Sequence, residues 1–193
     1  MYGNVPYNIT DLVVCAQNSA GAHTGTPVKL QYGQECSVDP QAKTDELTGY
    51  GLTVELMTII THANLSMAQG GIDLDTYEIV AGMTVTQSGT TPNQEREAHK
   101  EAGGQGLPYF GMVGRLPSAN GSALLVGLMR CKLDSLPSLN VEQNQFVMGE
   151  VGGKSIRNPG SSYVDVPFIL KQQETAGAIT LTSAWFDTFF GIS

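Results

Sequence analysis

Charged side chains are scarce in this 193-residue sequence. They make up 15% of the residues, against about 25% in an average soluble domain. Basic residues are the scarcer sign, with 10 Lys and Arg against 18 Asp and Glu, for a formal net charge of −8. This balance argues against conventional nucleic-acid binding, which needs a basic stripe to neutralise phosphates. A neutral surface rich in hydroxyl and amide groups suits a protein that packs much of its exterior against neighbours.

Cysteine is equally sparse. Cys15, Cys36 and Cys131 are widely spaced and form no CxxC pair, so they fit neither a disulfide framework nor a zinc site. We expect reduced, mostly buried thiols.

The first residues carry neither a basic nor an apolar signal region, and no run approaches 18 apolar residues, so we expect neither secretion nor membrane spanning.

Catalytic and cofactor motifs are also missing. His23, His62 and His99 have no carboxylate or cysteine at the spacing of metal ligands. The glycines of segment 103–106 precede a strand-like segment and no Lys-Ser/Thr pair, so they do not make a phosphate-binding loop. There is no GxSxG and no HExxH. We expect no catalytic residue, cofactor or metal; a Cys–His nucleophilic pair stays open as an alternative.

The pattern that dominates is an alternation with period two. From Met57 to Met67 the odd positions are mostly apolar and the even positions mostly polar, which predicts a strand with one face on the core. Val54 and Leu56 have the opposite parity, which predicts a bulge near Leu56. Segment 163–171 also alternates, and Pro167 marks it as an edge strand or a bulged one.

Segment 123–133 is apolar on both faces over most of its length, so a second layer or a neighbouring subunit must cover it. Six further strands are predicted, over residues 9–16, 28–32, 83–87, 107–116, 145–151 and 178–182. One helix is predicted over 73–81, with Asp73 as N-cap and Gly82 after its end. Segment 93–102 is predicted to be a short helix or a loop. The fold class is therefore mainly β, an antiparallel sandwich or barrel flanked by one short helix.

Two segments suit contacts with other molecules. Residues 37–51 are long and polar between two strands, and are either an arm or a surface loop. Residues 176–193 contain Trp185, Phe186, Phe189 and Phe190, whose spacing fits one face of a helical turn. These aromatic side chains must be covered by the chain's own core or by a neighbour. The whole of 1–193 is predicted to be one domain.

The order of these elements resembles the major tail (tail-tube) proteins of long, non-contractile-tailed bacteriophages. The resemblance covers residues 7–175. It rests on the arm, the strand ending at Met67, the short helix, and three segments that read GMTVTQSGTTPN, PYFGMVGR and MRCKL.

That resemblance implies stacked, usually hexameric rings that form a hollow tube for DNA. It implies that residues 37–51, and with them Asp39, Lys43, Asp45 and Glu46, form an arm that contacts the adjacent ring. The N- and C-terminal arms are implied to bridge rings as well. The implied partners are other copies of the chain, a tape-measure protein, and tail tip and terminator proteins. DNA would pass without sequence-specific binding. The implied location is the virion tail, assembled in the host cytoplasm, with no membrane.

We further expect a net negative tube lumen that repels DNA phosphates, with Glu55 and Glu150 as the candidate lumen residues. Three alternatives remain. The first is another β-rich phage protein, namely a contractile-tail tube subunit, a tail terminator or a capsid decoration protein. The second is a carbohydrate-binding β-sandwich, and the third is an enzyme with an unrecognised site.

Overall fold

The structure is a computed structural model that describes residues 9–30, 33–49, 52–70, 73–101, 106–136, 138–140, 148–163, 165–175 and 177–192. Across these residues the chain is mainly β and forms eleven strands and two short helices, which confirms the predicted fold class. In chain order they are β1 (Asp11–Gln17), β2 (His23–Lys29), β3 (Gly33–Gly49), β4 (Leu52–Gly70), α1 (Leu74–Ala81), β5 (Thr84–Thr90), β6 (Asn93–His99), β7 (Tyr109–Pro117), β8 (Ala123–Leu133), β9 (Ser138–Asn140), β10 (Met148–Ile156), β11 (Phe168–Gln173) and α2 (Ser183–Phe190).

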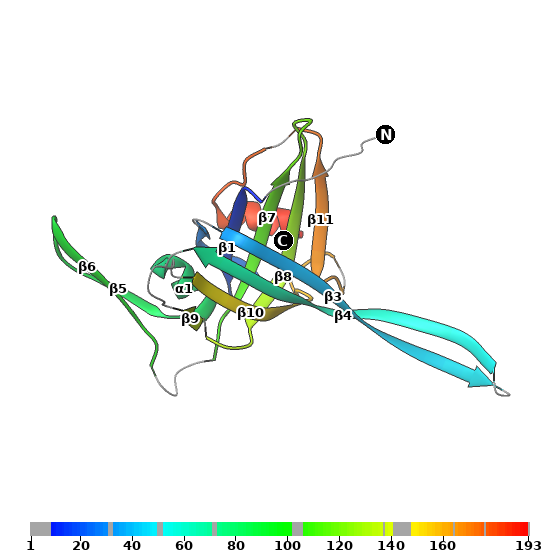
Figure 1. The fold of residues 1–193 in the computed structure, drawn as a ribbon. Coiled ribbons are helices and arrows are strands. Elements are labelled where there is room, and N and C mark those ends of the chain that lie inside the picture. The colour runs from blue at the N-terminus through cyan, green and yellow to red at the C-terminus, as the bar shows by residue number, and fades with distance from the viewer. Residues whose placement is uncertain are drawn as a thin grey trace.

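Nine strands form one antiparallel sheet in the order β2-β1-β7-β8-β10-β4-β3, with β11 added to β8 and β9 to β10. Strand β8 pairs with β11 along its first half and with β10 along its second half. The sheet curls so that β3 and β4 cross in front of β7 and β8 (Figure 1). Within the described strands β3 and β11 do not pair, so the sheet does not close into a complete barrel.

The core between the curled parts of the sheet is aliphatic. Val14 of β1, Ala63 of β4 and Leu128 of β8 are fully buried there, and α1 adds Val80. Helix α1 has the predicted caps. The Asp73 carboxylate accepts a hydrogen bond from the backbone N–H of Asp75, and Gly82 ends the helix with a φ of 62°, the left-handed conformation that glycine adopts most readily.

A second cluster lies on the outer face of the sheet, beneath α2. Helix α2 buries Phe186, Phe189 and Phe190 against residues of β1, β7 and β8, including Val13 and Met129. Helix α2 is a second helix beyond the one predicted. It explains the two apolar faces of β8, because one face contacts the inner core and the other contacts this helix. The second layer that segment 123–133 needed therefore comes from the chain itself.

Several predicted boundaries are wrong. Segment 93–102 is largely the strand β6, because it pairs in register with β5, and local propensity is a weaker determinant than cross-strand pairing. Residues 178–182 form no strand, and only the second half of segment 163–171 does. Strand β2 begins five residues before the predicted segment 28–32. Strand β11 is an edge strand, as Pro167 predicted.

Candidate assembly surfaces

The most prominent surface feature is the hairpin β3–β4, which extends far beyond the body of the protein (Figure 1). We call its outer part, residues 42–49 and 52–60, the arm. Near its root Ala63, Leu65 and Met67 are buried in the inner core. Beyond Thr61, where the pairing register shifts, the side chains of β4 become exposed. The arm is thus a two-stranded ribbon, and no other part of the chain that the structure describes covers either of its faces.

Large apolar side chains lie on this unsupported ribbon. Their exposed fractions are 61% for Leu47, 61% for Leu56, 60% for Met57, 48% for Ile59 and 47% for Ile60. The predicted core strand over 57–67 is therefore correct only for its second half, because the first half leaves the body. Exposed apolar residues gathered in one place mark an interaction surface, and a two-stranded ribbon in water is marginally stable at best.

The pairing register assigns these residues to the two faces of the arm, since directly opposite residues share a face. One face, which we call the Met57 face, contains the pairs Lys43–Ile59, Asp45–Met57 and Leu47–Glu55. The other face contains Ala42–Ile60, Thr44–Thr58 and Glu46–Leu56. The Met57 face therefore presents three large apolar side chains and the other face presents two.

The four residues predicted to form the inter-ring arm do not all lie together. Lys43, Asp45 and Glu46 are on the arm and exposed. Lys43 and Asp45 form an ion pair with an Nζ–Oδ1 distance of 3.1 Å. Asp39 is nearer the body, opposite Asn64. The segment 37–51 thus begins inside the sheet, and the second strand of the arm comes from β4, which sequence reasoning had assigned wholly to the core. The predicted bulge is present, because the register shift between Leu47 and Thr48 leaves Val54 unpaired.

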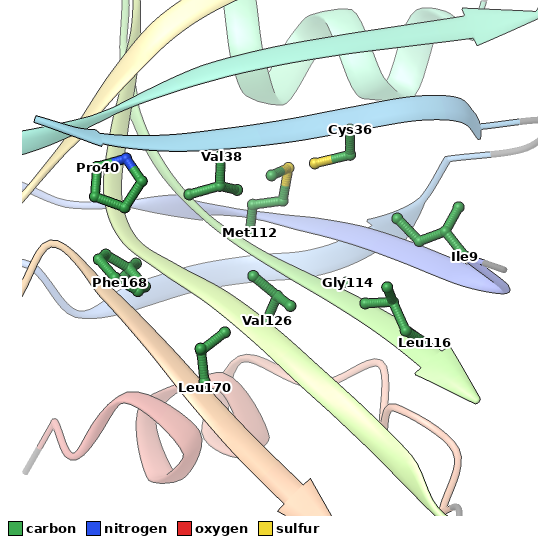
Figure 2. Close-up of a pocket in the computed structure, with 10 residues that line it drawn as sticks. All are labelled: Ile9, Cys36, Val38, Pro40, Met112, Gly114, Leu116, Val126, Phe168 and Leu170. Carbon is green, nitrogen blue, oxygen red and sulfur yellow. The ribbon is translucent and has the colours of Figure 1, made fainter. Parts of the chain in front are cut away.

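An apolar groove lies at the opening of the sheet, between β3 on one side and β7, β8 and β11 on the other (Figure 2). Its volume is about 460 Å³. The residues that line it are Ile9, Cys36, Val38, Pro40, Met112, Gly114, Leu116, Val126, Phe168 and Leu170. None of these carries a charge. Figure 2 shows the side chains of Val38, Phe168, Val126 and Leu170 converging from the two walls.

A second hairpin, β5–β6, extends from the opposite side of the body (Figure 1). Its side chains are polar and nearly all exposed. Arg96 of β6 forms an ion pair with Asp75 of α1, which fixes this hairpin to the helix. The pKa of Arg96 is raised because Asp75 accepts a hydrogen bond from it. The protein therefore presents an apolar hairpin and a polar one on opposite sides.

A polar row crosses the sheet at right angles to the strands. Asp39, Asn64, Lys154 and Lys132 lie opposite one another on β3, β4, β10 and β8. Asp39 and Lys154 are exposed and the other two are partly exposed, so neither helix covers this row. Of the two predicted lumen residues, Glu55 lies on the exposed arm instead of the body. Glu150 is opposite Ala68 in the sheet, and its side chain lies outside the described part of the structure.

The C-terminal aromatic residues are covered by the chain's own sheet, and residues 183–190 do not extend as an arm. Phe186 and Phe190 are 0% exposed and Phe189 is 6% exposed. Trp185, which is partly exposed, stacks on Phe189 with ring centroids 5.3 Å apart. Gly127 makes room for these rings, because a Cβ there would lie 2.4 Å from Phe189. Trp185 thus packs one face of its ring against this cluster.

One cluster brings together residue types that occur in nucleophilic catalysis. His23, on β2, is buried and contacts Asp187 of α2, and the charge of Asp187 also acts on Cys15 of β1. The Cys15 thiol is 0% exposed and lies 3.7 Å from the carbonyl oxygen of Thr24. Burial and the nearby carboxylate raise the pKa of Cys15 to about 12. A thiol in that environment stays protonated, and a reactive cysteine needs the opposite. The contacts between His23 and Asp187 join β2 to α2.

The described residues contain no group of three or more His, Cys, Asp or Glu side chains arranged to hold a metal ion. No helix in the described part of the chain has the length and apolar character needed to cross a membrane. A scan against protein-family models finds no match, and a search of curated proteins finds no significant relative. The candidate site is therefore defined by geometry alone, as the arm, the groove and the open sheet edges.

Sequence reasoning missed the groove and the apolar character of the arm. The signal for the arm was present in the alternation of segment 54–60, where apolar residues occur at both parities. A strand that packs one face on a core is apolar on that face only. Apolar residues on both faces are typical of a ribbon whose two faces contact other molecules. The groove had no local signal, because its walls come from segments far apart in the sequence.

Proposed function

We propose that this protein is a structural subunit that assembles with copies of itself, and specifically a subunit of a phage tail tube. In this role copies associate side by side into rings, and the rings stack into a hollow conduit for DNA. The proposal begins from the resemblance of three sequence segments to tail-tube proteins. The observation that carries it is the arm, a long paired hairpin with five exposed large apolar side chains.

The arm is a feature that makes sense only in an assembly. A lone chain would gain no stability from extending a ribbon of Leu, Met and Ile into water, and exposed apolar ribbons promote uncontrolled association. Covering these residues with another subunit turns that liability into a specific contact. The open edges of β2, β3 and β11 support the same proposal, since a ring of subunits can pair such edges.

The two oppositely placed hairpins suit stacking, because each subunit can then contact a neighbour on either side. The polar row Asp39, Asn64, Lys154 and Lys132 is the best candidate in the described sheet for the wall of the conduit, since it is hydrophilic and uncovered. This replaces Glu55 as a wall residue. The row contains two lysines and one aspartate, so acidic residues elsewhere would have to make the lumen negative as expected.

Electron microscopy and analytical ultracentrifugation of the purified chain test the proposal. We expect rings or hollow tubes at high protein concentration. The double variant Leu47→Lys, Leu56→Lys should remain folded by circular dichroism and should no longer assemble. The matched control is Leu136→Lys with Leu181→Lys, since both leucines are exposed (48% and 45%) and lie outside the arm. A chain that stays monomeric at every concentration would refute the proposal.

A further inference from the structure

The apolar groove is a cavity open to solvent at the place where the sheet fails to close. One wall is β3, through residues such as Val38, and the other is formed by β7, β8 and β11. Among the residues that line it, Leu170 of β11 is 58% exposed; Figure 2 shows its side chain beside Val126 and Phe168. The groove thus combines an unfilled apolar interior with an exposed apolar rim residue, which is the composition of a docking site and not of a completed core.

We propose that this groove receives the Met57 face of the arm of a second copy of the chain. The inference rests on the proposed self-assembly and specifies the contact that drives it. The three apolar side chains of that face, Leu47, Met57 and Ile59, would enter the groove and contact Leu170 and the aliphatic residues behind it. Each subunit then both donates an arm and accepts one.

The arm cannot fill the groove of its own chain. Strands β3 and β4 pair continuously along the hairpin apart from three register shifts, and the ribbon leads away from the body (Figure 1). The groove lies beside the root of that same hairpin, where Cys36 and Val38 of β3 form part of its wall. Folding the tip back to the root would break the ladder that holds the arm together. An arm that occupies this groove must therefore belong to another molecule.

Two of the three charged side chains on the Met57 face are paired with one another. Lys43 and Asp45 neutralise one another in an ion pair of 3.1 Å, so this face can approach an uncharged wall with less loss of hydration. Its remaining charge, Glu55, lies opposite Leu47 toward the tip. On the other face Glu46 lies opposite Leu56, and neither Glu46 nor Glu55 has an ion-pair partner among the described residues. Burying either carboxylate against an apolar wall is costly, so the choice of the Met57 face rests on its three large apolar side chains against two on the opposite face.

The arm and the groove occur at different places on the same molecule. A second copy of the chain therefore supplies an arm for the groove of the first. Such a contact is heterologous: it uses two unlike surfaces, and it leaves the copy that donates its arm with a free groove and the copy that accepts the arm with a free arm. Repetition gives a closed ring or an open helical stack, depending on the rotation between copies. That is the geometry that rings and tubes need.

Site-specific photo-crosslinking tests the contact. The photo-reactive amino acid benzoylphenylalanine is placed at position 57 in one sample and at position 58, on the opposite face, in another. Unlabelled and ¹⁵N-labelled chains are mixed so that crosslinks between copies are recognised by mass spectrometry. We expect position 57 to crosslink between copies to peptides that contain Met112 or Leu170, and position 58 to give far fewer such products.

A pair of matched variants adds a second readout. Leu170→Glu should lower the yield of groove crosslinks from position 57 about tenfold or more, equivalent to about 1.4 kcal/mol of contact free energy, because a carboxylate would be placed against apolar side chains. Leu181→Glu, at another exposed leucine (45%) outside the groove, should change the yield less than twofold. Circular dichroism checks that both variants are folded.

The outcomes separate this inference from the proposed function. Tubes without groove crosslinks would overturn the arm–groove contact but would still support the proposed function as a tube subunit. Groove crosslinks in small oligomers without rings or tubes would support the contact and count against the tube. Crosslinks only within one chain, or none at concentrations where copies associate, would overturn the docking contact.

Discussion

The Nδ1 atom of His23 lies 2.8 Å from the Oδ1 atom of Asp187, so that β2 is joined to α2 across 164 residues of sequence. The same carboxylate oxygen accepts the backbone N–H of His23 at 2.9 Å. The imidazole ring stacks on Phe190 with centroids 5.3 Å apart. This contact fixes the aromatic helix to the sheet at its polar side, while the phenylalanines fix it at its apolar side.

The neighbours of His23 determine its protonation state. The Nε2 atom of Gln17 lies 2.9 Å from Nε2 of His23 and donates to the carbonyl oxygen of Met129 at 2.8 Å. Because the Gln17 amide nitrogen is a donor, the facing imidazole nitrogen must accept, and the ring proton is then on Nδ1, donated to Asp187. A second ring proton would face another donor. His23 is therefore neutral.

We predict that acid destabilises the protein through this histidine. Burial lowers the pKa of His23 below its usual 6.5, although Asp187 opposes the shift. The unfolded chain therefore binds a proton at a higher pH than the folded chain does, and stability is complete above about pH 6.5 and decreases as the pH falls from there toward the folded pKa. Urea unfolding between pH 5 and 7.5, in steps of about half a pH unit, measures this slope.

The control for this prediction is a pair of histidine variants. His23→Gln should flatten the dependence of the unfolding free energy on pH in that window. His62→Gln, at a partly exposed site on β4, should show the same dependence as the parent protein. A parent protein whose unfolding free energy does not change between pH 7.5 and 5 would show that His23 does not stabilise the fold in its neutral form.

Gly127 is predicted to be essential for seating α2. A methyl group at this position of β8 would lie 2.4 Å from Cε1 of Phe189 and 2.8 Å from Cε1 of Phe190. Both rings are packed in the outer cluster and cannot move freely, so Gly127→Ala should cost about 1–3 kcal/mol through overpacking. Thermal unfolding followed by near-ultraviolet circular dichroism, which senses the aromatic cluster, measures this effect. Gly152→Ala, at an exposed position of β10 where the nearest atom to an added Cβ is 4.0 Å away, should cost much less; equal losses would contradict the packing argument.

Asp11 is predicted to stabilise the edge of the sheet through two cations. Its carboxylate forms ion pairs with Lys29 of β2 and with Arg115 of β7, the latter at 2.5 Å. Burial alone would raise the pKa of Asp11, but the Lys29 hydrogen bond and the Arg115 charge more than offset it and lower that pKa below 3.8. Asp11→Asn should therefore destabilise the protein by about 1–3 kcal/mol at neutral pH.

The sign of the pH effect gives the test for Asp11. A lowered pKa means that the stabilisation is present above about pH 3.8 and is lost as the pH falls through the folded pKa. The loss caused by Asp11→Asn should thus shrink below pH 3.8 in chemical unfolding experiments. Asp165→Asn, whose ion pair with Arg157 is exposed, should change stability by less than about 1 kcal/mol. A deficit for Asp11→Asn that does not depend on pH would contradict this account.

Substitutions in β4 are predicted to have different effects on the unfolding free energy on the two sides of Thr61. Leu56→Lys lies on the exposed arm and should change the unfolding free energy of the monomer by no more than about 0.5 kcal/mol. Leu65→Ala, only nine residues away but 3% exposed in the inner core, should cost about 2–5 kcal/mol. Chemical unfolding at low protein concentration, where copies do not associate, measures both. A large loss for Leu56→Lys under those conditions would mean that the arm is packed on its own body.

The local elements were predictable because their signals are local. Asp73 and Gly82 cap a two-turn helix with an apolar stripe, and the structure places that helix where the sequence did. Strands β7 and β8 alternate or are continuously apolar, and both exist within two residues of their predicted bounds at each end. Strand β6 was missed because its sequence, NQEREAH, favours a helix or a loop when taken alone and becomes a strand only by pairing with β5.

The amino-acid sequence by itself determined the fold class, the capped helix, the low charge and the need to cover the aromatic residues near position 190. Those are consequences of side-chain chemistry and of spacing along the chain. Only the tertiary structure decided that α2 covers those aromatic residues, that the apolar residues from Leu56 to Ile60 leave the body, and that the sheet stops short of closure beside β3. These features depend on contacts between segments far apart in sequence, and such contacts are set by the packing of the whole chain.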